Sequence, residues 1–340
     1  GDVFAEFQYL PRFLDFNVRF DRKAIRWDPH PHIFKYTLHK LEVGASFPFT
    51  DRMRLTLSPF AALAYSVDLG QQPFPSSPPT SVPTNNFYTG AKTELVYDNS
   101  VSTGMNLMEG SRGKISLTHY QGMDNNALSF SRASIDLRHY QKIYKEIVFA
   151  VRGFSGTFFG NAPKKFLLGG MNNWLFNKTY MEGVTSSGQV NPLGLETGTQ
   201  DLLFVEYANN LRGFDYATLF GNSVMLMNAE LRIPLVRALS NGPIASNFFR
   251  NLQFIGFYDV GTSWSGKPPF SSETSVSYNV IRNGPFTAQI KNYLNPWLYS
   301  YGVGVRTVVF SYYLKFDLAW PVENYDVGKP RGFLTLGFDF

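Results

Sequence analysis

Few residues in this 340-residue chain are spaced for catalysis or metal binding. Ser116 and His119 are close in sequence, but residues three apart on a strand face opposite sides of it, so they do not predict a catalytic pair. His30 and His32 flank a proline without a third metal ligand nearby, which favours solvated loop histidines over a metal site. No Gly-x-Ser-x-Gly hydrolase motif occurs. We therefore expect no catalytic residue, no metal and no cofactor, and the chain is not predicted to be an enzyme.

The composition narrows the remaining classes of protein. The chain contains no cysteine, which excludes disulfides, thiolate metal sites and cysteine nucleophiles. Its net charge of +5 is modest and spread along the sequence, so no nucleic-acid partner is expected. No segment approaches the roughly 18 to 20 uninterrupted apolar residues that a membrane-spanning helix needs. The mean hydropathy of −0.16 still fits a membrane β-barrel, because only every second residue of a barrel strand faces lipid.

Period-two alternation of apolar and polar residues recurs along the chain and is typical of strands with two unlike faces. The pattern predicts thirteen strands, at 3–10, 13–27, 33–49, 53–67, 87–98, 111–121, 129–140, 146–156, 223–235, 252–264, 299–309, 313–321 and 332–340. The long connections between them are 68–86, 157–222 and 265–298. Pro59 falls inside the fourth of these strands, where it removes a backbone donor and predicts a bulge or a break.

Three features favour a transmembrane β-barrel over a soluble β-sandwich, which also alternates. Aromatic residues cluster at strand ends, and short connections alternate with long ones. The chain also ends on an aromatic strand, whose residues Leu336, Phe338 and Phe340 resemble the C-terminal assembly signal of bacterial outer-membrane barrels. The predicted fold class is therefore all-β, an antiparallel barrel that crosses the membrane.

A series of short motifs in a fixed order resembles the core of the BamA-type superfamily of outer-membrane barrels, which includes the surface-antigen barrels. The motifs are a glycine-rich segment at 168–173, Leu211-Arg212-Gly213-Phe214, Gly221-Asn222, Asn-Ala-Glu-Leu-Arg-Ile-Pro at 228–234 and Phe-Tyr-Asp-Val-Gly-Thr at 257–262. The resemblance extends back to 97–99 and 109–112 and forward through 301–306 to the last strand, so it covers effectively the whole chain. Each motif alone is weak, but the ordered combination is specific.

The resemblance implies a sixteen-stranded barrel in the bacterial cell outer membrane, with a long extracellular loop that folds inward. That loop is 157–222, and its tip is Leu211, Arg212, Gly213 and Phe214. The resemblance also implies that the tip arginine pairs with Glu230 and Asp259 on the barrel wall, as a planar guanidinium can hold two carboxylates.

The register of the strands bears on this pairing. Alternation places Glu230 on the same face as Asn228 and Arg232, which supports an inward orientation. It leaves Asp259 open, because that face of the strand also carries Ile255 and Phe257. A second Arg-Gly-Phe sequence at 152–154 lies within an alternating segment, and we expect it to be ordinary strand.

The chain departs from the family pattern in two places. The stretch 172–210 is an insertion between the glycine-rich segment and the tip, and it predicts either a larger extracellular surface or a plug in the lumen. Counting strands back from the extracellular loop also leaves thirteen where the family has sixteen. We therefore expect 1–340 to be a single barrel domain whose first three strands, and any periplasmic N-terminal domain, are missing upstream.

The resemblance implies an insertase or translocase that assembles or exports proteins through strand pairing at a lateral seam. Its partners would be outer-membrane lipid and lipopolysaccharide, unfolded outer-membrane proteins or a secreted substrate, and periplasmic or lipoprotein accessory subunits. Two alternatives keep the fold but change the role. The barrel could be a membrane anchor or scaffold subunit of an outer-membrane complex, or it could be a porin or substrate channel.

Overall fold

The structure is a computed structural model that describes residues 2–9, 14–27, 32–71, 83–124, 127–175, 200–208, 210–240, 242, 244–270, 276–283, 286–293, 295–310, 312–337 and 339. Among these residues no helix has the length and hydropathy that a membrane-spanning helix needs. The helical elements are η1 (Gln200–Phe204), α1 (Leu235–Leu239) and α2 (Asn247–Arg250).

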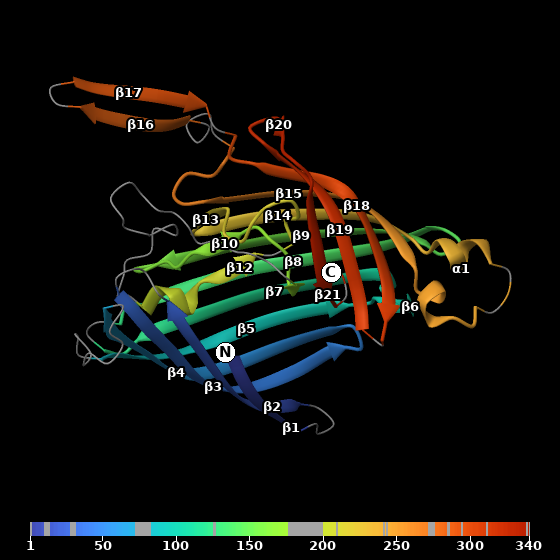
Figure 1. The fold of residues 1–340 in the computed structure, drawn as a ribbon. Coiled ribbons are helices and arrows are strands. Elements are labelled where there is room, and N and C mark those ends of the chain that lie inside the picture. Colours follow the sequence, from blue (N-terminus) through green and yellow to red (C-terminus); the bar gives the residue numbers. More distant parts are fainter. Residues whose placement is uncertain are drawn as a thin grey trace.

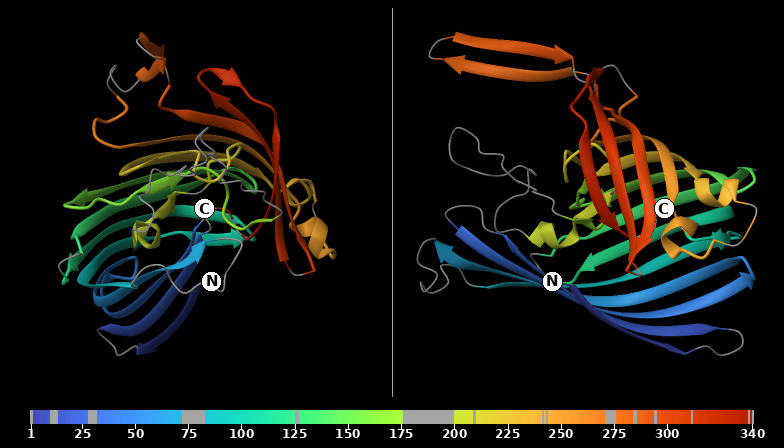
Figure 2. Two further views of the ribbon diagram at one scale, coloured as in Figure 1. Left: turned by 60° about the vertical axis from the view of Figure 1, so that its left-hand side comes forward. Right: turned by 45° about the vertical axis from the view of Figure 1, so that its right-hand side comes forward.

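One large antiparallel sheet dominates the described residues and curves around those of the connection between 160 and 223, which we call the inner loop (Figures 1 and 2). Its long strands pair in chain order: β1 (Asp2–Tyr9), β2 (Asp15–Trp27), β3 (His32–Thr50), β4 (Met53–Gln71), β5 (Thr84–Asp98), β7 (Leu107–Gly122), β8 (Phe130–Tyr144), β9 (Ile147–Gly160), β14 (Ser223–Ile233), β15 (Gln253–Trp264), β18 (Leu298–Val309), β19 (Tyr312–Glu323) and β21 (Arg331–Leu336). Each of the thirteen predicted strands overlaps one of these, so the predicted fold class is confirmed.

Shorter strands attach to this sheet or lie beside it. β6 (Val101–Gly104), β11 (Trp174–Leu175) and β20 (Asp326–Val327) pair with β7, β21 and β19 respectively. A small sheet inside the barrel contains β10 (Phe166–Leu168), β12 (Glu206–Ala208) and β13 (Leu219–Gly221), and a separate hairpin contains β16 (Val276–Asn283) and β17 (Phe286–Tyr293). The large sheet is not closed, since its order runs from β1 at one end to β11 at the other.

The two faces of the sheet differ as the alternation predicts. On β19, Lys315 and Asp317 are buried on the inner face, whereas Phe316 between them is 51% exposed on the outer face. Leu336 belongs to the outer face of β21, and Thr335 beside it is buried. Phe338 and Phe340 lie outside the described residues, so the C-terminal assembly signal stays a prediction.

Pro59 lies within a continuous β4 and causes no bulge. Its neighbours keep one register with β3, because Glu42 pairs with Phe60 and Ala45 pairs with Leu57. Around Pro59 the ladder to β3 is interrupted between these two pairs, while Pro59 stays in register with Ala91 of β5. The missing proline N–H therefore breaks the pairing locally without shifting it, so the predicted break occurs and the predicted bulge does not.

We expect Phe316→Arg to destabilise the barrel by about 2–4 kcal/mol, the cost of an arginine on the lipid face near the bilayer midplane. Unfolding in denaturant, followed by heat-modifiability on gels, measures the change. Tyr325→Arg adds the same charge at a solvent-exposed turn and serves as the control. Equal stability of the two variants would show that the outer face of β19 is not in lipid.

Candidate functional site: the loop tip in the barrel lumen

The connection between β9 and β14 returns into the space that the sheet encloses. Its residues Leu211, Arg212 and Phe214 are each at most 5% exposed. Gly213 has φ +87°, a conformation that favours glycine, and a side chain there would lie 3.2 Å from Pro321 of β19. The tip therefore passes close to the wall, at a position where only glycine fits without strain.

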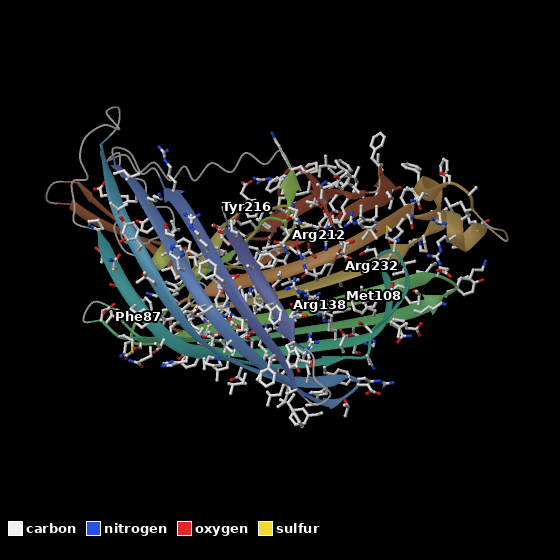
Figure 3. The ribbon with its side chains drawn as sticks, turned by 90° about the horizontal axis from the view of Figure 1, so that it is seen from below. Phe87, Met108, Arg138, Arg212, Tyr216 and Arg232 are labelled. Atoms are coloured by element: carbon white, nitrogen blue, oxygen red, sulfur yellow. The ribbon has the colours of Figure 1, made fainter. Side chains whose placement is uncertain are left out.

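Arg212 is held by two carboxylates on neighbouring strands. Its Nε and Nη2 donate to Oδ2 and Oδ1 of Asp259 at 2.6 and 2.7 Å, and its Nη1 donates to Oε1 of Glu230 at 2.8 Å. The guanidinium also lies 3.7 Å from the ring centroid of Phe257. Fork-shaped pairing of this kind fixes orientation as well as position. Figure 3 shows Arg212 and Arg232 among the side chains inside the curved sheet.

The carboxylates are themselves oriented by further donors. Asn228 Nδ2 donates to Asp259 Oδ1 at 2.8 Å, and Arg232 donates to Oε2 of Glu230 at 2.9 and 3.0 Å. We call Arg212, Asn228, Glu230, Arg232 and Asp259 the loop-tip ion cluster. All five side chains are at most 2% exposed, and the two positive and two negative charges balance. Charge balance and multiple hydrogen bonds are the conditions under which buried charges are tolerated.

The electrostatics of Arg212 follow from these contacts. Burial alone would lower its pKa, but Asp259 and Glu230 together hold the pKa well above its ordinary value. The guanidinium is therefore charged at every pH the protein meets, and the cluster acts as a permanent electrostatic anchor. In this arrangement both wall carboxylates, Glu230 and Asp259, accept hydrogen bonds from arginine, which suits them to holding a loop.

A second group of buried charges lies further along the inner wall. Arg306 donates to Asp317 at 2.8 and 3.1 Å and to Asp339 at 2.9 and 3.2 Å, and Lys315 Nζ lies 3.1 Å from Asp339. We call Arg306, Lys315, Asp317 and Asp339 the C-terminal ion cluster. Alternation predicts that Lys315 and Asp317 face inward, but it could not show that they meet Arg306 and Asp339.

Asn106, at the turn between β6 and β7, bridges the two clusters. Its Nδ2 donates to Asp339 Oδ2 at 2.9 Å, and its backbone carbonyl accepts from Arg232 Nη1 at 3.0 Å. Gln253 also donates to the carbonyl of Met105 at 2.6 Å. The sequence does not reveal that this hairpin contacts the lumen charges. Its local signal is an asparagine, a residue type that tolerates a left-handed backbone, and Asn106 adopts a positive φ of 59°.

The second Arg-Gly-Phe sequence, at 152–154, lies within a strand, as alternation predicts. Arg152 of the second Arg-Gly-Phe sequence lies on β9 and binds Asp136, so that segment is ordinary strand as expected. One end of the insertion is described inside the barrel. The ring of Phe204 in η1 lies 5.1 Å from that of Phe130 and 5.3 Å from that of Tyr88, centroid to centroid, and both partners are on the wall. Residues 176–199 lie outside the described residues, so the choice between a plug and a larger extracellular surface stays open.

A family model described as the Omp85 superfamily domain matches residues 33–340. The chain belongs to the Omp85 superfamily. None of the curated proteins matches it in sequence.

Solved structures with the same fold include BamA from Haemophilus ducreyi lacking POTRA domains 1–3. It shares 12% identity at a TM-score of 0.57, over 99% of this chain and 61% of that one. CdiB from Acinetobacter baumannii shares 14% identity at a TM-score of 0.52, over 98% of this chain and 50% of its own. CdiB from Escherichia coli shares 11% identity at a TM-score of 0.51, over 98% of this chain and 52% of its own. At these identities the likeness shows the fold, and the chain spans only half to three fifths of each structure.

We predict that Arg212→Ala lowers the free energy of unfolding by about 3 kcal/mol, because it leaves two buried carboxylates without their shared partner. The temperature at which the folded band disappears in heat-modifiability gels measures this loss. Arg152→Ala is the control. It removes the arginine of the second Arg-Gly-Phe sequence, on β9, whose side chain is 13% exposed, compared with 1% for Arg212. Equal melting of the two variants would contradict an anchoring role for the tip.

Proposed function

We propose that this chain is the membrane barrel of an outer-membrane insertase or translocase, which assembles or exports other proteins by strand pairing at a lateral seam. The observation that carries the proposal is the buried contact of Arg212 with Glu230 and Asp259. It fixes a large inward-folded loop against the wall beside the last strands. Membership of the Omp85 superfamily supports the same role.

The reaction needs no covalent chemistry. An unpaired strand edge in lipid leaves backbone N–H and C=O groups without partners, which costs several kcal/mol for each group. A client segment that pairs with such an edge satisfies those groups and adds a strand to the sheet. The bilayer and its lipopolysaccharide supply the surroundings, and the clients are unfolded outer-membrane proteins or secreted substrates. Periplasmic or lipoprotein subunits would deliver them.

The packing of the loop favours this role over a diffusion pore. The ring of Phe204 in η1 lies 5.4 Å from that of Tyr120, centroid to centroid. Phe204 is buried against the inner wall with Tyr88 and Phe130. A pore for small solutes needs water at this position. An anchor or scaffold role is compatible with the same packing, and only an activity measurement separates it from an insertase.

The test uses the full-length protein in liposomes with an unfolded outer-membrane barrel as client. We expect client insertion, seen as protease protection and heat-modifiability, to exceed that in empty liposomes and to fall in Arg212→Ala. Arg152→Ala should keep the parental rate. Insertion no faster than in empty liposomes would refute the proposed function, and solute conductance without insertion would favour the channel.

A further inference from the structure

The connection between β14 and β15 carries exposed apolar side chains at one end of the barrel. It contains α1 and α2, and Figure 1 shows α1 at the end of the sheet opposite to β16 and β17. Leu239 of α1 is 73% exposed, and Phe249 of α2 is also exposed. A contiguous apolar patch on a protein surface marks a place that a protein partner or a membrane covers. The position of α2 on the barrel wall bears on which of the two it is.

α2 lies against the outer face of β18. Thr307 Oγ1 donates to the carbonyl of Phe248 at 3.0 Å. Thr307 stands between Arg306 and Val308, which are both buried on the inner face, so its own side chain points outward. Val303, further along the same outer face, is exposed. The connection therefore turns out over the wall and onto the face that the strand presents to lipid.

The level of this contact along β18 corresponds to the edge of the hydrocarbon layer. A strand that crosses a membrane needs about 9–11 residues. β18 has 12 residues, Leu298–Val309, and Thr307 is the tenth of them. We therefore expect α2 to lie where the hydrocarbon ends and the phospholipid headgroups begin.

Exposed aromatic side chains surround α2 at this level. The rings of Phe248 and Phe249 pack edge to face with their centroids 5.2 Å apart. Phe254 and Tyr312 are the first outward residues of β15 and β19, and both are exposed. Phe310, in the turn between β18 and β19, is 91% exposed. We call Phe248, Phe249, Phe254, Phe310 and Tyr312 the aromatic rim.

The charges of the connection suit phospholipid headgroups. Residues 235–250 contain two arginines and no acidic residue. Arg237 pairs with Glu146 of the neighbouring β8–β9 turn at 2.8 Å, which ties α1 to the wall. Arg250 follows Phe249 in α2 and donates to the side chain of Asn247 at 2.6 Å. A cation beside exposed rings matches the boundary of a phospholipid leaflet, where phosphate groups lie next to acyl chains.

We propose that the β14–β15 connection is an interfacial anchor, which binds the phospholipid leaflet at this end of the barrel through the aromatic rim and Arg250. By the orientation that the family resemblance implies, this is the periplasmic leaflet. Lipid is favoured over a protein partner because the rim continues the outward faces of β15, β18 and β19. The anchor fixes the depth of this wall in the bilayer. It does not depend on the proposed function, because it needs only the barrel in a membrane.

Single cysteines carry the test, because the chain has no native cysteine. Phe249→Cys is labelled with a fluorescent bimane in the full-length protein, which is reconstituted in vesicles of phosphatidylcholine and phosphatidylglycerol. An interfacial segment lies about 5–10 Å into the boundary of headgroups and acyl chains. We therefore expect nitroxides on the lipid headgroup or high on the acyl chain to quench most of the emission, and aqueous iodide to quench little of it.

Tyr312→Cys gives the reference depth on the wall, because Tyr312 belongs to the outer face of β19. The same lipid nitroxides should quench its probe to a similar extent. Val101→Cys is the matched control at the same end. Val101 is exposed on β6, but its hairpin reaches inward, where Asn106 binds Asp339 of the C-terminal ion cluster. Iodide should quench this probe, and the lipid nitroxides should quench it much less.

The two quenchers together decide the assignment. A Phe249→Cys probe that behaves like the one on Val101→Cys places α2 in water and overturns the anchor. A probe that neither iodide nor the lipid nitroxides reach is covered by protein, and the lipid assignment is then wrong. Strong quenching by the lipid nitroxides, as in Tyr312→Cys, supports the anchor whether or not the protein inserts clients.

Arg250→Gln tests the electrostatic part of the anchor. It removes the charge and keeps a polar side chain at that position. We expect headgroup quenching of the Phe249→Cys probe to be stronger with phosphatidylglycerol than in phosphatidylcholine alone, and Arg250→Gln to abolish this difference. Lys329→Gln removes a charge from the turn between β20 and β21 at the other end and should preserve the difference. A difference that persists in Arg250→Gln would rule out a role for this arginine.

Discussion

The pairing of Arg212 with Asp259 and Glu230 is the contact on which the inner loop depends. Removing three charged groups from water costs several kcal/mol for each ion, and the arrangement persists only because each charge has several partners. Arg212 supplies donors to both carboxylates, Asn228 orients Asp259, and Arg232 orients Glu230. Removing Arg212 takes from both buried carboxylates the partner that they share, so this one side chain holds the tip against the wall.

The same constraint extends from the loop tip to the C-terminal end of the chain. Arg232 shares Glu230 with Arg212 and also donates to Asn106, which in turn binds Asp339. Asp339 then accepts from Arg306. Strands β14, β15, β18 and β19, the β6–β7 turn and the end of the chain are therefore joined through buried hydrogen bonds.

Much of this architecture could be predicted from the sequence. The strands were predictable because alternation is a local property, and it fixed which face carries Glu230 and Lys315. The family resemblance predicted that Arg212 pairs with Asp259. Alternation alone did not decide whether Asp259 faces inward. The meeting of Arg306, Asp317 and Asp339 could not be predicted, because it depends on residues from three separate segments. Pro59 shows the same limit, since its neighbours in β3 and β5 decide between a break and a bulge.

β11 was beyond sequence reasoning for a physical reason. Two residues are too few to show alternation, so Trp174 and Leu175 become a strand only because β21 presents an edge to them. What positions them lies four residues before Trp174, where Gly170 permits close contact with Tyr216 and Leu211. The glycine-rich segment therefore has a structural role that its sequence does not reveal. It lets one loop hold both an arginine in the lumen and a short strand at the sheet edge.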